Sequence, residues 1–384
     1  KHWAGFPSEA IKFCLEDEDI SIEQVDHITI SRDPKANFYK KVLFSLKYKI
    51  SIATIWDRLK NSKKVSSVKG ELATIFEVPE SAIKAKLHNI EHHRSHIASS
   101  FFAARFEKSA ILSIDGFGDF TSTMSAVGSG SKFEVMDTVN YPHSLGVFYT
   151  TVTQFLGFPN YGDEYKVMGL APYGEAKYLK ELNEILKMTS DGFFKLNCKY
   201  FKHFKEGVAM DWENGSPSIE SLFTDDWSDL LGKPRAKGDE LEQWHIDLAT
   251  SVQRLTENVI FHMLNHLHAK TGLDNICITG GVAQNSVANG RILENTPFKN
   301  IYVPSAGHDA GTSIGSALYL YNQILGNERL PETTTAYFGK KATQSEIISV
   351  LDAKGVEYSI LKDVELFDKV SDKLVEGGVI GWFQ

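Results

Sequence analysis

The chain has 384 residues, of which 41 are Lys or Arg and 49 are Asp or Glu, giving a net charge of −8 at neutral pH. Its hydrophobic fraction of 42% excludes a disordered or collagen-like chain. The acidic balance argues against nucleic-acid binding through bulk charge. No apolar run is long enough to cross a bilayer, and no secretory h-region stands at the start. Three widely spaced cysteines cannot build a disulfide framework, so we expect a reducing cytoplasm.

The first part of the chain predicts helices followed by a β-meander. A capped amphipathic helix begins at Ser8, a strand covers 26–31, and residues 35–84 are mainly helical and basic. The lysines of this stretch form either a phosphate-facing patch or a solvated helical face: Lys40, Lys41, Lys47, Lys49, Lys60, Lys63 and Lys64. Strands separated by tight turns are then predicted over 110–114, 121–127 and 133–139.

The second part predicts repeated αβ units. Helices are expected over 144–158, 175–188 and 240–268, and the polar stretch 190–240 lacks a period and predicts a lid or insertion. Strands and helices then alternate over 276–279, 283–293, 301–303 and 311–325, and a third αβ unit closes the chain. A meander followed by αβ units predicts a mixed-sheet α/β protein of two similar halves. The start at Lys1 and the apolar end Gly381-Trp382-Phe383-Gln384 suggest a fragment.

Two histidine pairs have the spacing that places both imidazoles on one helical face. His262 and His266 lie near the end of a long predicted helix, where the macrodipole favours histidine without any metal. His92 and His96 instead open a helix directly after a predicted strand, where ligand sites of α/β sheets gather. With Asp309, at another strand-to-helix junction, they would suit iron(II) or zinc; a solvated histidine-rich helix start is the alternative.

A turn with two glycines and two aspartates joins the first two strands of the meander: Asp115, Gly116, Gly118 and Asp119. Glycine lets backbone N–H groups converge on a phosphate, and the aspartates could hold a cation or orient a nucleophile. An ordinary hairpin turn, in which Gly and Asp are preferred, is the alternative.

Two further segments carry candidate binding groups. Gly280 and Gly281 follow a buried strand and precede Asn285 at a helix start, a geometry that lets backbone amides approach a nucleotide. Glu164 could bind ribose hydroxyls, and Lys166 could bind an anionic acyl-phosphate. Tight packing turns in the first case and an exposed capping turn in the second are the alternatives.

The order of these segments resembles that of the O-carbamoyltransferases of the nodulation and antibiotic-tailoring type. The run from Tyr165 to Ala171 is the most specific part, and the similarity covers almost the whole chain. A broader resemblance is to the tRNA threonylcarbamoyl-transfer proteins within the actin/sugar-kinase/Hsp70 superfamily. The resemblance implies a duplicated ribonuclease-H-like core with a nucleotide between two lobes.

The resemblance also implies the roles of the site residues. An iron-type divalent ion would be held by His92, His96 and Asp309, and carbamoyl-adenylate would be the bound species. Asp119 and Lys166 are then the catalytic candidates. The nucleotide-binding candidates are Asp115, Gly116, Gly118, Glu164, Gly280, Gly281 and Asn285.

The same resemblance divides the chain into three parts. Residues 1–150 would form a first lobe that lacks its N-terminal strands, and residues 151–335 a second lobe with the insertion at 190–240. Residues 336–384 would be a closing αβ unit leading into a missing Sua5/YrdC-like domain, which makes carbamoyl-adenylate from carbamoyl phosphate and ATP. We therefore expect this fragment to be inactive alone.

The implied activity is carbamoyl transfer to a hydroxyl of a sugar, glycolipid or natural product, with ATP and carbamoyl phosphate as co-substrates. The alternatives are tRNA threonylcarbamoyl transfer and a non-catalytic nucleotide- and metal-binding regulatory module. A small hydroxylated acceptor is the expected partner, nucleic acid and membrane are not, and homodimer formation is left open.

Overall fold

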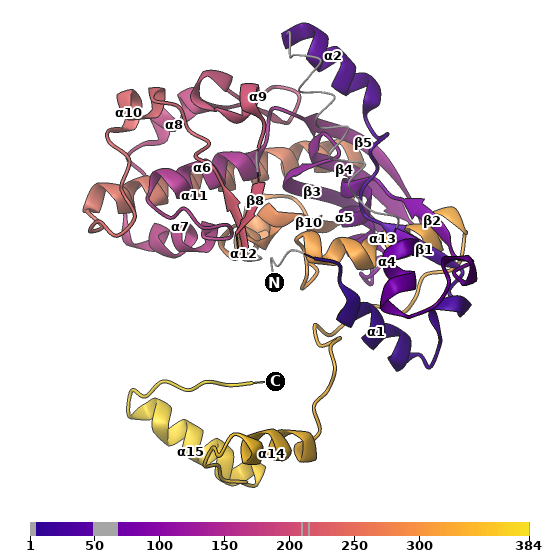
Figure 1. Ribbon diagram of the computed structural model, residues 1–384. Helices are drawn as coiled ribbons and strands as arrows, with labels where there is room; N and C mark the ends of the chain where they lie inside the picture. Colours follow the sequence, from indigo (N-terminus) through magenta and orange to yellow (C-terminus); the bar gives the residue numbers. More distant parts are fainter. Residues whose placement is uncertain (1–4, 49–67, 209, 214–215, 384) are drawn as a thin grey trace. The chain divides into compact units, whose positions relative to one another are not determined.

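The computed structural model describes residues 5–48, 68–208, 210–213 and 216–383 (Figure 1). They fall into two compact units, with the division in the sequence between Ala336 and Tyr337. Four lysines of the predicted basic stretch, at positions 49, 60, 63 and 64, lie outside the described residues.

A five-stranded mixed sheet forms the centre of the larger unit, in the order β11-β10-β3-β4-β5. The predicted meander is confirmed as β3 (Lys108–Gly118), β4 (Thr121–Ser129) and β5 (Lys132–Asn140), which pair antiparallel. The αβ strands β10 (Asn275–Thr279) and β11 (Asn300–Tyr302) add in parallel beside β3. Strands from both sides of the expected lobe boundary at residue 150 therefore share one sheet.

The sheet is buried on both faces at β3, β4 and β10, and β3 and β10 are apolar at successive positions. Leu112 and Ile114 pack into one core with α6 (Leu145–Phe155) and α11 (Gln243–Thr271). Ile111 and Cys277 face the opposite way, into a second core. There they meet α5 (His92–Phe101), which also packs on α13 (Thr312–Leu318). The helices predicted for 144–158 and 240–268 are thereby confirmed.

A second, two-stranded parallel sheet joins β1 (His27–Ile30) and β2 (Lys86–Asn89). Its small core contains Ile22, Leu72, Ile83 and Ala85. The helices of this part are α1 (Ser8–Asp17), α2 (Phe38–Tyr48) and α4 (Val68–Ile75). Strand β1 packs on α13, and Thr29 Oγ1 lies 2.9 Å from Ser316 Oγ. Strand β2, which ends just before the histidines, pairs with β1 and is therefore attached through β1 to the rest of the unit.

The stretch 190–240, predicted as an aperiodic lid or insertion, contains short regular elements. Two hairpins form, β6–β7 (Leu186–Met188 with Phe194–Leu196) and β8–β9 (Met210–Glu213 with Ser216–Ile219). Strand β6 also shortens the helix predicted over 175–188 to α8 (Leu179–Ile185). Trp227, in α10 (Asp226–Leu231), is fully buried in the main core, and its Nε1 donates to Tyr200 O at 2.7 Å. This stretch is therefore anchored to the core.

The smaller unit contains α14 (Gln344–Ala353) and α15 (Asp363–Val375). Within residues 337–383 no strand is formed, so the strand of the αβ unit expected there is absent from this range. The apolar run near Trp382 lacks a neighbouring strand within these residues.

The imidazole of His143 makes folding stability pH-dependent. Burial, with the nearby Lys195, lowers its pKa to about 4, and its Nδ1 accepts the Leu196 N–H at 3.2 Å. The unfolded chain therefore binds a proton that the folded chain excludes, and stability falls as pH drops from about 6.5 to 4. We expect a loss of up to about 3 kcal/mol in the free energy of unfolding across this window.

Urea unfolding at several pH values measures this loss. His143→Asn retains an acceptor that does not titrate, so its curve should be flatter than that of the wild type. His268→Asn, on the last turn of α11, is the control and should follow the wild type. An unchanged slope in His143→Asn would refute the assignment.

Candidate metal centre

Two imidazoles face each other at the start of α5. His92 and His96 stand one helical turn apart, and their Nε2 atoms are 3.1 Å apart. The helix begins here because Glu91 caps it, accepting the Arg94 N–H at 2.8 Å. Asp119 adds a second cap by accepting the His92 N–H at 3.0 Å. Both caps hold the first turn, and with it the first imidazole.

Two carboxylates complete the group. Asp115, near the end of β3, places Oδ2 at 3.0 Å from His92 Nε2 and 3.4 Å from His96 Nε2. Asp309, in the short turn Asp309–Gly311 before α13, places Oδ1 at 3.5 Å from both nitrogens. The Asp309 side chain is 62% exposed, whereas those of the other three are at most 13% exposed. The group is therefore open on the side of Asp309.

Asp115 is oriented by the double-glycine turn. Its Oδ1 accepts the Gly281 N–H at 3.0 Å, which leaves Oδ2 for the histidines. A Cβ on Gly281 would lie 2.7 Å from Oδ1, so this approach requires glycine. Gly280, at φ +94°, donates its N–H to Gly307 O at 2.8 Å and so ties this turn to the loop that carries Asp309. Backbone contacts thus position both carboxylates.

The charges in this group compensate one another. Burial disfavours the ionised forms, but the two histidines outweigh it and hold the pKa of Asp115 well below its usual value. In the same way, the carboxylates overcome burial and raise the pKa of His92 well above its ordinary value. Two anions at one point thus require positive charge, which protons on the imidazoles or a divalent cation can supply.

The donor set and its spacing fit a divalent metal ion. Ligand atoms about 2.1 Å from a metal lie about 3.0 Å apart in octahedral and about 3.4 Å apart in tetrahedral geometry. The five distances that involve a histidine nitrogen are 3.0 to 3.5 Å, and all four atoms lie within 4.8 Å of one another. Among the described residues, no second group of three or more such ligands is found. Two imidazoles and two carboxylates suit several metals and do not select one.

The remaining histidines of interest lie elsewhere. His93, between the two ligands, turns into the sheet, where its ring nitrogens meet Ser113 Oγ at 2.8 Å and Thr121 O at 3.1 Å. Burial lowers its pKa to about 3 and keeps it neutral. In the second pair, His262 Nε2 meets Thr189 O at 2.9 Å, and the His266 ring packs near Phe193. That pair joins α11 to the β6–β7 turn.

The hairpin glycines have different surroundings. A Cβ on Gly118 would lie 2.0 Å from His92 Cδ2, whereas one on Gly116 would have no atom within 4 Å. Gly118 is therefore required by the histidine, and Gly116 leaves open space. The carboxylate of Asp119, a catalytic candidate, accepts N–H groups from His92 at 3.0 Å and from Asp33 at 2.7 Å. In this structure it holds two backbone segments together.

The other candidates are fixed by local partners. Glu164 accepts from Thr150 Oγ1 at 2.6 Å, and Lys166 Nζ lies 2.8 Å from Asp163 Oδ1. Asn285 caps the helix Ser286–Asn295 by accepting the Ala288 N–H at 3.0 Å. Its amide also pairs with that of Gln253 in α11, at 2.8 and 2.9 Å. Each of these side chains is therefore held by a neighbouring residue.

Tyr161 is a site residue that sequence reasoning missed. It is half-buried; burial raises the pKa of its hydroxyl, and the negative charges of Asp309, Asp115 and Glu164 raise it further. Tyr161 is therefore within electrostatic reach of Asp309, Asp115 and Glu164. The available signal was its place one residue before the Gly162-Asp163-Glu164 run.

The fold and this site define an α/β protein with a candidate metal-ligand group where strand ends meet helix starts. Residues 1–318 match the family described as carbamoyltransferase N-terminus, and the chain belongs to that family. Over its whole length it is 36% identical to an uncharacterized protein, sll1178, of Synechocystis sp., covering 62% of that protein. It is 31% identical, again over its whole length, to the nodulation protein NolNO of Sinorhizobium fredii, covering 52% of that protein.

A solved structure, HypF of T. kodakarensis, aligns with 64% of this chain and 38% of its own chain, at 15% identity and a TM-score of 0.33. The chain thus spans less than two thirds of each of these proteins. None of the helices in the described ranges is both long and apolar enough to cross a membrane.

Removal of one imidazole tests the metal group. We expect His96→Ala to lower bound metal from about one ion per chain to less than about a tenth, because a ligand is lost from a four-ligand set. His266→Ala, from the other pair, should keep full occupancy. Elemental analysis after dialysis against iron(II) or zinc measures both. Full occupancy in His96→Ala would disprove the assignment.

The close approach of Gly118 gives a second test. Gly118→Ala should displace the His92 ring and weaken metal affinity about tenfold or more, because the added methyl group overlaps the imidazole. Gly116→Ala, two residues away in open space, should retain the wild-type affinity for metal. Competition with a fluorescent chelator measures both constants. Equal affinities in the two variants would contradict the geometry.

Proposed function

We propose that this chain is the transfer part of an O-carbamoyltransferase that uses carbamoyl-adenylate. The observation that carries the proposal is the group of His92, His96, Asp115 and Asp309, in a chain of the carbamoyltransferase N-terminus family. The acceptor hydroxyl of a sugar, glycolipid or natural product attacks the carbamoyl carbon. The new C–O bond forms the carbamate, the bond from that carbon to the phosphate oxygen breaks, AMP leaves, and the hydroxyl proton passes to solvent.

The four ligands would hold a divalent ion, iron(II) or zinc, which when bound supplies Lewis-acid polarisation of the donor phosphate. Gly116, with its open surroundings, leaves room for that phosphate beside β3. Lys166 would neutralise the charge of the phosphate by leaving its ion pair with Asp163 and pairing with the phosphate instead. We assign Asp119 a positioning role, because it holds the backbone of His92 in place. This assignment takes the place of the catalytic role expected from the resemblance.

The adenosine would lie against Glu164, Gly280, Gly281 and Asn285. The fixed carboxylate of Glu164 suits ribose hydroxyls. The Gly281 N–H is already bound to Asp115 and is not a free donor for the nucleotide. The turn would instead let the nucleotide come close to the backbone. Tyr161, which is within electrostatic reach of Glu164 and of the two carboxylates, would also contact the donor.

We also propose the duplicated ribonuclease-H-like core for the whole protein. The five-stranded sheet would be the core of one lobe, and β1–β2 would be part of the other. On this proposal the boundary between the lobes lies at the start of β3 instead of at residue 150. The relatives are longer than this chain, and we propose that the full-length protein also has an activating domain of Sua5/YrdC type, as the resemblance implies. Such a domain would make carbamoyl-adenylate from carbamoyl phosphate and ATP.

Mass spectrometry of acceptors tests the proposal. The full-length protein, supplied with carbamoyl phosphate, ATP and a panel of sugars, should release AMP and add about 43 Da to one acceptor, the mass of a carbamoyl group replacing hydrogen. His96→Ala should abolish the product, and His266→Ala should keep it. The proposal fails if neither AMP nor a mass shift appears across the panel.

A further inference from the structure

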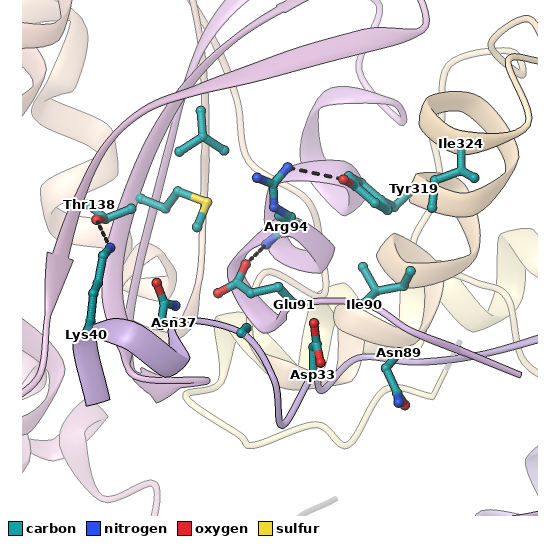
Figure 2. A pocket seen from close by; sticks show the side chains of 13 residues that line it. Asp33, Asn37, Lys40, Asn89, Ile90, Glu91, Arg94, Thr138, Tyr319 and Ile324 are labelled. Atoms are coloured by element: carbon teal, nitrogen blue, oxygen red, sulfur yellow. Dashed lines mark hydrogen bonds between the residues drawn. The ribbon is translucent and has the colours of Figure 1, made fainter. Parts of the chain in front are cut away.

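A cavity of about 560 Å³ lies beside the start of α5. Figure 2 shows Lys40 and Thr138 on one side, Tyr319 and Ile324 on another, and Glu91 and Arg94 between them. The walls include parts of α2, β4, β5 and α5 and the π-helix Tyr319–Ile324 that follows α13, so the cavity forms only in the tertiary structure. Its volume falls within the range of about 300–1,000 Å³ that is usual for small-molecule sites.

The charges that line this cavity balance. Two bases, Lys40 and Arg94, and two acids, Asp33 and Glu91, give no net formal charge. An anionic ligand would approach both carboxylates, and a cationic ligand would approach both bases. The lining therefore favours a neutral ligand that both donates and accepts hydrogen bonds.

Several of these groups have hydrogen-bonding capacity for a ligand. Lys40 Nζ donates to Thr138 Oγ1 and Asn140 Oδ1, both at 3.1 Å, and an ammonium has a third donor. Arg94 Nη1 donates to Tyr319 OH at 3.1 Å, and a guanidinium has four further donors. Vicinal ring hydroxyls offer the matching acceptors to these cations.

Glu91 provides the complementary acceptor. Its side chain is 8% exposed, Oε2 is bound to the Arg94 N–H, and Oε1 has no hydrogen-bond partner among the described residues. A buried acceptor in this state costs stability until a donor reaches it. A ligand hydroxyl would supply that donor.

The remaining lining is mixed. Asn37 and Asn89 add amides that can donate and accept hydrogen bonds, Ile90, Met124, Val135 and Ile324 add apolar surface, and Tyr319 adds an aromatic ring. Apolar and aromatic surface beside donors and acceptors matches a pyranose ring, which has C–H faces and hydroxyl edges. The cavity also adjoins the metal group, because Glu91 directly precedes His92, and Asp33 and His92 share the Asp119 carboxylate.

We propose that this cavity binds a neutral sugar ring of the hydroxylated acceptor. The proposal rests on the proposed carbamoyl transfer for the identity of the ligand as acceptor, but ring binding itself is measurable without any transfer. Lys40, Glu91 and Arg94 would bind the ring hydroxyls. The class of acceptor is thereby narrowed from any hydroxylated compound to a glycoside or a sugar-bearing product.

Saturation-transfer NMR on the 384-residue chain tests the binding directly. Methyl glycosides of glucose, galactose and N-acetylglucosamine are the probes, and inorganic phosphate and AMP are the anionic comparisons. At least one glycoside should bind, and Lys40→Met and Asn89→Ala should each weaken its affinity about fivefold or more. Asn89 is exposed at the end of β2, so that change disturbs no core. Lys47→Met, on the same helix as Lys40 but outside the lining, should bind like the wild type.

The outcomes separate this proposal from the transfer reaction. Glycoside binding that is sensitive to Lys40→Met and Asn89→Ala, without any carbamoyl product from the full-length protein, supports the ring site and refutes the transfer. A carbamoylated sugar whose KM is unchanged in both variants supports the transfer and refutes the ring site. Absence of glycoside binding, or phosphate binding that both variants abolish, also overturns the ring site.

Discussion

The carboxylate of Asp115 is the interaction on which the candidate site depends. One oxygen accepts the backbone N–H of Gly281, and the other faces the imidazoles of His92 and His96. Three segments far apart in the sequence therefore meet at a single side chain. Because one strand of the central sheet carries this side chain, the sheet itself sets the distance between the double-glycine turn and the start of α5.

Part of the site could be predicted from the sequence, namely the residues marked by helical spacing or by a strand-to-helix junction. The four-residue interval between His92 and His96 predicted one shared helical face, and the strand-to-helix position of Asp309 predicted a ligand at the same sheet edge. The structure places these three side chains together, although their binding of a metal stays a prediction. The residue pattern left open whether the aspartates of the glycine-rich turn hold a cation, and the resemblance assigns Asp115 to the nucleotide. The structure places the Asp115 carboxylate beside the two imidazoles, a contact that depends on the tertiary fold.

The fold, too, could be predicted only where the sequence has a clear hydrophobic pattern. Alternating and continuous apolar runs predicted the meander and the parallel strands, because burial on two faces leaves a clear pattern. Residues 190–240 have no such pattern, since their hairpins are short and their attachment to the core depends on side chains such as Trp227. The cavity beside α5 could not be predicted from the sequence either. Its lining residues, among them Lys40, Glu91 and Thr138, are neighbours only after folding.

The contact between α5 and α13 has a consequence for how the metal group would respond to its ligand. A Cβ on Gly315 would lie 1.8 Å from Ser95 O, so the two helices meet backbone against backbone, with no flexible side chain between them. The histidines stand on one of these helices, and Asp309 directly precedes the other. Helix packing therefore constrains the distances from the two imidazoles to Asp309. Binding would require little reorganisation, and the ion could be exchanged while the surrounding fold stays intact.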